Sequence, residues 1–264
     1  MRITSTLLLT LVAACGTNET PQPSPPATWP SCVPNRDGVI TPDELPIAIG
    51  ATLSFYVGAD RTVSLGGNGV WDLSIELPGD SVTAIGPIAL DTQWYATSFP
   101  AGQFVVDAGN GLDGIYHQDE RGLWLDGAAS HDPAPMAGKT LIAYATPLLA
   151  LRFPIADGDA FTATAVIPTG AVIDGLPFVG IDALDVDVTL GARLDVPYVQ
   201  FSPALRVRSH ATRTPSTGTP VATKRTTSFL FECFGEVARA ESNPNEPAID
   251  FTAAAYLRRF ALGK

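Results

Sequence analysis

The chain has 264 residues, of which 45% are hydrophobic and 16% are charged, and its formal net charge is -11. This balance excludes a disordered chain and a coiled coil, and it predicts a globular protein with a sizeable core. The Lys and Arg residues number 16 against 27 Asp and Glu, and they are scattered along the chain. Because nucleic-acid binding needs a basic patch, we exclude nucleic acid as a partner.

The first fifteen residues, MRITSTLLLTLVAAC, read as an export signal. Arg2 supplies one positive charge, and an apolar run from Leu7 to Ala14 follows it. This run is too short to span a membrane but fits a signal peptide. The stretch V-A-A-C resembles the lipobox of bacterial lipoproteins, which implies a signal peptide over residues 1–14 and lipidation of Cys15. The alternative is ordinary cleavage at an A-x-A-like site.

Residues 15–31 are expected to form a lipidated tether, because GTNETPQPSPPATWPS is rich in Pro, Ser and Thr and has no apolar period. Pro-rich segments stay extended at about 3.1 Å per residue. Gly16 stands where lipoproteins of the inner membrane tend to carry Asp, so the resemblance implies an outer-membrane location in the cell envelope. The expected membrane contact is the N-terminal lipid. The sequence identifies no cofactor and no protein or glycan partner.

Two cysteines remain besides Cys15, and we expect Cys32 and Cys233 to form a disulfide in an oxidising compartment. The bond would close a very long loop, which is worth roughly 4 to 5 kcal/mol in the chain-entropy model. Alternation along FLFECF predicts that Cys233 shares a strand face with Phe229 and Phe231. The alternative is two separately buried thiols.

Residues 32–46, CVPNRDGVITPDELP, are similar to an EF-hand calcium loop when Gly38 takes the sixth position. The residues that then occupy ligand positions three, five and twelve are Asn35, Asp37 and Glu44. Val33 replaces the Asp that begins coordination, and two prolines stiffen the loop. We therefore favour a Cys-anchored turn with Asn/Asp-Gly chemistry. A weak calcium site at these three residues is the alternative.

Residues 47–264 are expected to form a β-rich body, because Gly and Pro separate segments that alternate with period two. The predicted class is all-β, with an antiparallel sandwich or curved half-barrel sheets behind an extended N-terminal tether. We expect hairpins around 119–122 and 215–220, and a final strand in 249–262. The pattern predicts one continuous strand over 185–196, followed by a second strand that pairs with it. The inward residues expected on these two segments are Val186, Val188, Leu190, Leu194, Val196, Val199, Phe201, Leu205 and Val207.

The order of several motifs is similar to an uncharacterised β-rich module of bacterial secreted proteins, many of which end in a type IX secretion sorting domain. The motifs are GVWDLS, SFPAGQF, LALRFPIADGDAFTAT, ALRVRS and TSFLFECFGEVARAES. The likeness covers roughly residues 50–242. It implies a β fold and a surface location, with lipid attachment in place of sorting, and it carries over no catalytic residue.

No catalytic or metal-binding constellation stands out. The sequence contains neither G-x-S-x-G nor H-E-x-x-H. We expect the three histidines, His117, His131 and His210, to be solvated, and H-Q-D-E at 117–120 to bind no metal, because alternate strand residues face opposite ways.

Asp185 and Asp187 would lie about 7 Å apart on one strand face, which is within the range of an inverting glycosidase pair. We expect Arg206 and Arg208 to keep both carboxylates ionised, so a solvated face is favoured. The tryptophans that are expected in the core rather than in a ligand groove are Trp71, Trp94 and Trp124.

The sequence therefore favours an exported, lipid-anchored surface protein with a structural or binding role and no catalytic residue. One alternative is a carbohydrate-active hydrolase that uses acidic residues on a β face. Another is a carrier of lipid or hydrophobic cargo. A deep apolar cavity would favour the carrier, whereas a cleft with two opposed carboxylates would favour the hydrolase.

Overall fold

The structure is a computed structural model that describes residues 31–67 and 69–262. The expected signal peptide, Cys15 and nearly all of the expected tether lie outside the described residues. Within the described ranges, no helix is both long enough and apolar enough to cross a membrane.

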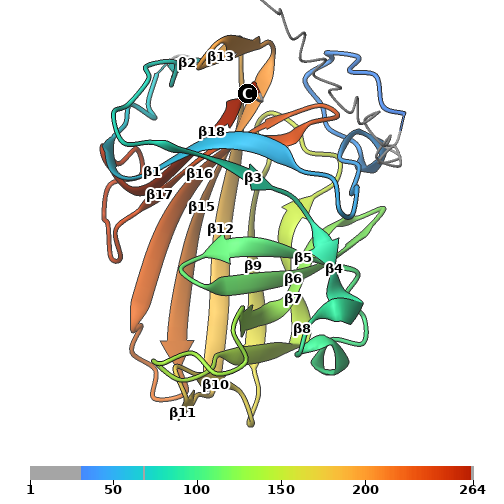
Figure 1. Cartoon of the computed structure of the whole chain (residues 1–264), viewed down its shortest axis with the longest axis vertical. Coiled ribbons are helices and arrows are strands. Elements are labelled where there is room, and N and C mark those ends of the chain that lie inside the picture. Colours follow the sequence, from blue (N-terminus) through green and yellow to red (C-terminus); the bar gives the residue numbers. More distant parts are fainter. Residues whose placement is uncertain (1–30, 68, 263–264) are drawn as a thin grey trace, which may run out of the picture.

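The fold is all-β, as predicted, and its largest element is an eight-stranded antiparallel sheet in the order β3-β1-β18-β17-β16-β15-β12-β9. Long strands of this sheet run side by side down the molecule in Figure 1. We call it the large sheet. Its strands are β1 Leu53–Thr62, β3 Ser81–Ile85, β9 Ala160–Ile167, β12 Gly180–Gly191, β15 Ala204–Pro215, β16 Ala222–Phe231, β17 Gly235–Ser242 and β18 Ala253–Ala261.

A seven-stranded sheet in the order β11-β10-β8-β7-β6-β5-β4 packs across the large sheet, and we call it the front sheet. In Figure 1 its strands cross in front of β9 and β12. The predicted hairpin at 119–122 is confirmed as the β6-β7 turn. The strands are β4 Ile88–Ala89, β5 Phe104–Gly109, β6 Leu112–Asp119, β7 Gly122–Ser130, β8 Leu141–Arg152, β10 Val172–Ile173 and β11 Leu176–Pro177.

A three-stranded sheet covers part of the outer face of the large sheet, and it contains a parallel pair of β13 and β2. Its strands are β2 Val70–Asp72, β13 Arg193–Val196 and β14 Val199–Phe201. The helices are single 3-10 turns: η1 Pro42–Glu44, η2 Leu90–Thr92 and η3 Ala96–Ser98.

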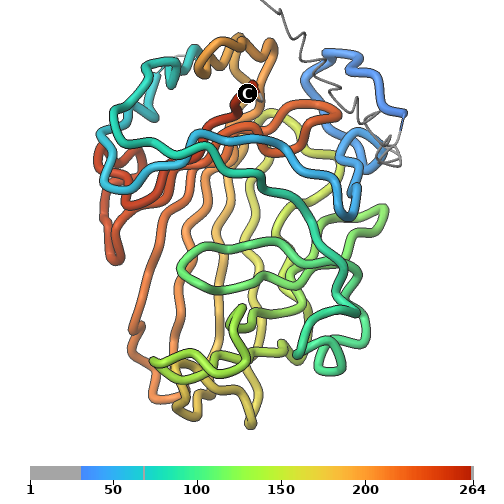
Figure 2. Tube along the Cα trace, viewed as in Figure 1, coloured from blue at the N-terminus to red at the C-terminus, as the bar shows by residue number. Residues whose placement is uncertain are grey.

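The chain passes between the large and front sheets four times. Two of these connections form corners that can be followed along the trace in Figure 2. Edge strand β3 passes to edge strand β4 through Gly86 and Pro87, and β8 passes to β9 through residues 153–159. A Cβ at Gly86 would lie 2.0 Å from the Ala51 carbonyl oxygen, so the first corner requires glycine. The two sheets therefore enclose a common interior.

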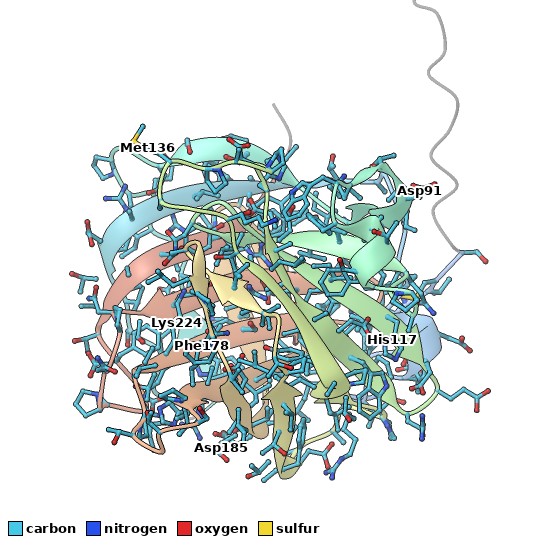
Figure 3. All side chains as sticks on the ribbon, turned by 90° about the horizontal axis from the view of Figure 1, so that it is seen from below. Asp91, His117, Met136, Phe178, Asp185 and Lys224 are labelled. Carbon is cyan, nitrogen blue, oxygen red and sulfur yellow. A yellow bond between two sulfur atoms is a disulfide. The ribbon has the colours of Figure 1, made fainter. Side chains whose placement is uncertain are left out.

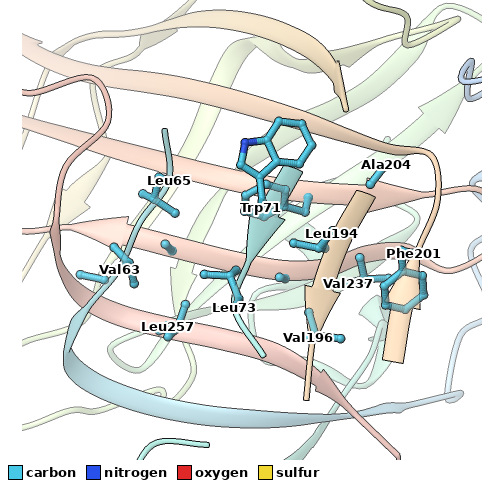
Figure 4. Packing of buried hydrophobic residues seen from close by; sticks show 14 of the residues in the cluster. Val63, Leu65, Trp71, Leu73, Leu194, Val196, Phe201, Ala204, Val237 and Leu257 are labelled. Atoms are coloured by element: carbon cyan, nitrogen blue, oxygen red, sulfur yellow. The ribbon is translucent and has the colours of Figure 1, made fainter. Parts of the chain in front are cut away.

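The largest hydrophobic cluster lies between the three-stranded sheet and the outer face of the large sheet (Figure 4). Trp71 is 1% exposed, and its ring lies 5.1 Å from that of Phe229. A second cluster contains Val186 and Val207 and faces the interior between the sheets. The third covers the opposite face of the front sheet, where Tyr95 packs with the η2-η3 segment.

The prediction of one continuous strand over 185–196 was wrong, because the segment is divided between two strands. β12 ends at Gly191, where a Cβ would lie 2.2 Å from the Trp71 ring, and β13 then joins a different sheet. Leu194 and Val196 therefore pack on the outer side of the large sheet, opposite to Val186. Phe201 does the same from β14.

Arg206 was expected on a wet face but is only 6% exposed. Its guanidinium lies 5.1 Å from the centre of the Trp71 ring and donates a 2.7 Å hydrogen bond to the Leu65 carbonyl. The three-stranded sheet covers this part of the strand, and alternation along one strand does not reveal such a cover.

The predicted disulfide between Cys32 and Cys233 is confirmed, with Cα atoms 5.5 Å apart. The expected strand position of Cys233 was wrong, because β16 ends at Phe231 and Cys233 lies in the following turn with φ of 68°. The Cys233 N–H also donates to the Glu44 carbonyl at 2.7 Å. The N-terminal segment is thus attached to the β16-β17 turn by a covalent bond and a backbone bond.

The predicted hairpin around 215–220 and the predicted final strand also agree with the structure. Residues 216–221 connect β15 to β16, and the final segment contains strand β18. Asp157 and Asp159 flank Gly158 in the β8-β9 turn, where Gly158 has φ of 79°.

Candidate ligand-binding cavity

A cavity of about 680 Å³ lies in the common interior and is partly open to solvent. Its volume is within the range of about 300 to 1,000 Å³ that is typical of small-molecule sites. Alternation along each strand sends every second side chain into this space. The cavity is thus a direct product of two sheets that are packed face to face and connected by the chain.

Most of the lining is apolar. Leu184, Val207 and Leu230 enter from β12, β15 and β16 of the large sheet. Leu125 and Leu148 face them from β7 and β8 of the front sheet. Such walls favour the hydrophobic part of a ligand, because burial removes its apolar surface from water.

Charged side chains of the large sheet also point into the cavity. Register pairs Arg239 of β17 with Ser228 of β16 on one side and with Arg258 of β18 on the other. These three side chains therefore share one face of the sheet. The alternate residues Ala238 and Ala240 are 0% exposed and pack on the outer side.

Glu236 is the centre of this charged cluster. Its carboxylate accepts hydrogen bonds from Ser228 Oγ at 2.7 Å, Arg239 Nε at 2.9 Å and Arg258 Nε at 2.8 Å. Arg258 Nη2 contacts the same carboxylate. Burial raises the pKa of Glu236, but the guanidinium groups of Arg239 and Arg258 outweigh it and hold the pKa at about 2. Glu236 is therefore ionised at neutral pH.

Glu241 extends the cluster towards β16, where it contacts Lys224. Its other oxygen lies 3.5 Å from Arg239 Nη1. The Lys224 side chain is 39% exposed and the Arg239 side chain is 24% exposed, and both line the cavity. Part of each of these two side chains is thus accessible from the cavity.

A second polar group links the two sheets. Arg213 of β15 donates two hydrogen bonds to Asp182 of β12, at 2.8 and 2.7 Å. The Tyr144 hydroxyl of β8 donates to the same carboxylate at 2.6 Å. Burial, together with the charge of Asp182, raises the pKa of Tyr144, so the phenol stays protonated.

Tyr116 enters the cavity from the front sheet. Its ring packs over Gly114, where a Cβ would lie 2.7 Å from the ring, and it stacks on Phe104 at 5.9 Å. Burial raises the pKa of Tyr116, so its hydroxyl remains a hydrogen-bond donor. Among the described residues, this hydroxyl has no hydrogen-bond partner.

The calcium-like residues instead make local turns. Asp37 accepts from the Val39 N–H at 2.8 Å, and Asn35 donates to Asp37 at 3.1 Å. Glu44 accepts from the backbone and the hydroxyl of Thr41, at 3.0 and 2.9 Å, and so caps η1. Within residues 31–67 and 69–262, no group of three His, Cys, Asp or Glu side chains is placed to hold a metal ion.

The acidic pair predicted on β12 lies on the outer face of the large sheet. Asp187 pairs with Arg208 at 2.7 Å, as expected, and Asp185 accepts from the Thr162 hydroxyl at 2.6 Å. His210 lies opposite Asp185 across the β12-β15 ladder. In Figure 3, Asp185 lies near the lower edge of the molecule, whereas Lys224 lies further inside its outline, left of the centre.

His117 was expected to be solvated, but its side chain is 20% exposed and lies 2.8 Å from the Asp126 carboxylate. Its ring stacks on Trp124. Burial raises the pKa of Asp126. His131 has an exposed side chain and lies 3.3 Å from Asp113.

Trp71 lies in the core, as predicted, and Trp94 packs against the third cluster. Trp124 is half-buried and donates to Asp119 at 3.0 Å. The described cavity lining contains none of these three tryptophans.

Sequence reasoning missed the charged cluster. In GEVARAES the charged residues alternate with alanines, and a polar face is ordinarily assigned to solvent. Here the apolar face is covered by the three-stranded sheet, so the polar face turns into the interior. Comparison of the chain with family models, with curated proteins and with solved structures gives no match.

Proposed function

We propose that this protein is an exported, lipid-anchored binding protein of the cell envelope that holds a hydrophobic small molecule between its two sheets. The observation that carries the proposal is the cavity of about 680 Å³ with mostly apolar walls. The export signal and the lipobox-like V-A-A-C stretch support a membrane-attached location, with the outer membrane as the expected one. In such a place the ligand would be a lipid or another sparingly soluble compound.

The proposal adopts the carrier alternative in preference to a purely structural role. A structural protein has no need of an open apolar interior, because filling it would stabilise the fold. The hydrolase alternative has less support, because Asp187 is paired with Arg208 and faces outward with Asp185.

A neutral fluorescent probe, N-phenyl-1-naphthylamine, tests the proposal. The full chain carrying Cys15→Ser is used, so that no attached acyl chain and no detergent competes for the cavity. We expect saturable binding of one probe per chain. Surface adsorption without saturation would contradict the proposal.

Two tryptophan variants locate the binding. Ala211 lines the cavity and is exposed, so Ala211→Trp adds bulk into open space. Ile181 is 46% exposed, and it points away from the cavity because it precedes the inward-facing Asp182 on β12. We expect Ala211→Trp to abolish binding and Ile181→Trp to leave it unchanged. Equal effects of the two would place the bound probe elsewhere.

A further inference from the structure

We infer that the ligand of this cavity is a single-chain amphiphile with a carboxylate head, such as a long-chain fatty acid, whose head lies beside Lys224 and Arg239. The inference rests on the proposed function and names the class of its ligand.

The charge of the cavity supports an anionic head. Four cations line it, namely Arg213, Lys224, Arg239 and Arg258. The lining also contains two carboxylates, Asp182 and Glu236. A third carboxylate, Glu241, contacts Lys224 and Arg239. One positive charge is therefore left in excess, in a chain whose formal net charge is -11. An anionic ligand would balance this charge where the surroundings screen it poorly.

The cations differ in how fully they are already paired. Arg213 makes a two-bond pair with Asp182, and Arg258 is 7% exposed and held by Glu236. Lys224 contacts only Glu241 among the described residues, and its ammonium carries three donors. Lys224 thus keeps two of its three donors unused, and its side chain is the most exposed of the four.

Two neighbours complete a head-group site. Glu241 contacts both Lys224 and Arg239, so the two cations lie beside one carboxylate. Tyr116 lines the same cavity from β6 of the front sheet, as Arg239 does from β17 of the large sheet. A carboxylate between them would accept charge-assisted hydrogen bonds from Lys224 and Arg239 and a third bond from the Tyr116 hydroxyl.

The cavity is also polarised along the strands of the large sheet. On β12 the cavity-facing residues change from Asp182 to Leu184, and on β15 from Arg213 to Val207. On β16 they change from Lys224 to Leu230. On these three strands the polar residues lie towards residues 216–221. On the neighbouring strand β17, Arg239 and Glu236 pair instead with Ser228 and Leu230, further along the sheet. An alkyl chain would therefore lie beside this diagonal of charged residues, against apolar side chains of the front sheet such as Leu125 and Leu148.

Displacement of N-phenyl-1-naphthylamine by three ligands of equal chain length tests the inference. Dodecanoate, dodecanol and dodecylamine are compared on the full chain carrying Cys15→Ser. We expect dodecanoate to bind at least about tenfold more tightly than dodecanol, because each charge-assisted hydrogen bond is worth that much. We expect dodecylamine to bind more weakly than dodecanol. Lengthening the acid should tighten binding by up to about fourfold per methylene until the cavity is filled.

A matched pair of variants assigns the head group. Lys224→Met keeps the apolar stem and removes the charge, and we expect it to abolish the preference for dodecanoate while leaving dodecanol binding unchanged. Arg225 is the next residue on β16 and donates to the Glu246 carbonyl on the outer side. Arg225→Met should therefore keep the preference. Tyr116→Phe should weaken dodecanoate alone, by a few-fold, as expected for one hydrogen bond.

Several results would overturn the inference. Equal binding of acid and alcohol, or tightest binding of the amine, would show that the cavity does not select a carboxylate, and the proposed function would stand. Equal loss of acid and alcohol in Lys224→Met would assign that residue a structural role. If the probe itself fails to bind, the proposed function and this inference both fail.

Discussion

Arg239 and Arg258 lie directly opposite each other on neighbouring strands, with both side chains in the cavity. Like charges in this position repel and destabilise a sheet. The Glu236 carboxylate bonds to both guanidinium groups and offsets the repulsion. The charged wall of the cavity therefore depends on one glutamate.

Replacing Glu236 with Gln should destabilise the protein by about 3 kcal/mol, because it leaves two enclosed cations without their partner. Urea unfolding measures the change. Glu120→Gln is the control, since Glu120 is exposed in the β6-β7 turn. A loss similar to that of the control would mean that solvent, rather than Glu236, balances the two arginines.

The lowered pKa of the Glu236 carboxylate predicts that the stability of the protein depends on pH. The pKa of Glu236 is lowered from 4.5 to about 2 in the folded protein. A lowered pKa stabilises the fold above the ordinary value, and this contribution is lost as pH falls from 4.5 towards 2. Unfolding free energy measured across this window should fall more steeply in the natural protein than in Glu236→Gln. If the unfolding free energies of the two proteins fell in parallel with pH, Glu236 would not have a lowered pKa in the folded protein.

Removing the disulfide should cost about 2 to 5 kcal/mol, because Cys32 and Cys233 restrict a long loop of the unfolded chain. Their separation is 201 residues. The double variant Cys32→Ser/Cys233→Ser is compared with Cys15→Ser by urea unfolding with and without reductant. Stability should depend on reductant only in Cys15→Ser. Two free thiols in the unreduced protein would refute the bond.

Calcium should bind the segment around Asp37 more weakly than micromolar. Asp37 and Glu44 already accept hydrogen bonds from Val39 and Thr41, so coordination would break local turns. Calorimetry with calcium checks this, with Glu44→Gln as the comparison. A dissociation constant of micromolar or below, lost in Glu44→Gln, would establish a true site.

Lipidation predicts that Cys15→Ser moves the protein from the membrane fraction to the soluble fraction and removes the mass of the lipid. Fractionation and mass spectrometry of the exported protein decide this. The variant Cys32→Ser serves as a control, because it changes a cysteine outside the lipobox-like stretch. Retention of the Cys15→Ser variant in membranes at unchanged mass would contradict attachment through this residue.

The all-β class was predictable because period-two alternation and turn residues are local signals. The disulfide was predictable because only two cysteines remained after Cys15. The break at Gly191 was not, because it depends on Trp71, which lies far away in sequence. The inward direction of Glu236 and Arg239 was also hidden, since alternation defines two faces but does not tell which one meets water. Only the cover over Ala238 and Ala240 decides that.

The most direct test of the central claim is the position of a bound ligand in a crystal. The protein carrying Cys15→Ser would be crystallised with 12-bromododecanol, a neutral ligand whose bromine gives an anomalous signal. We predict one bromine peak inside the cavity, against apolar lining residues such as Val207 of the large sheet and Leu148 of the front sheet. Bromine found only on the outer surface, with the cavity empty at saturating ligand, would contradict a binding role for the space between the sheets.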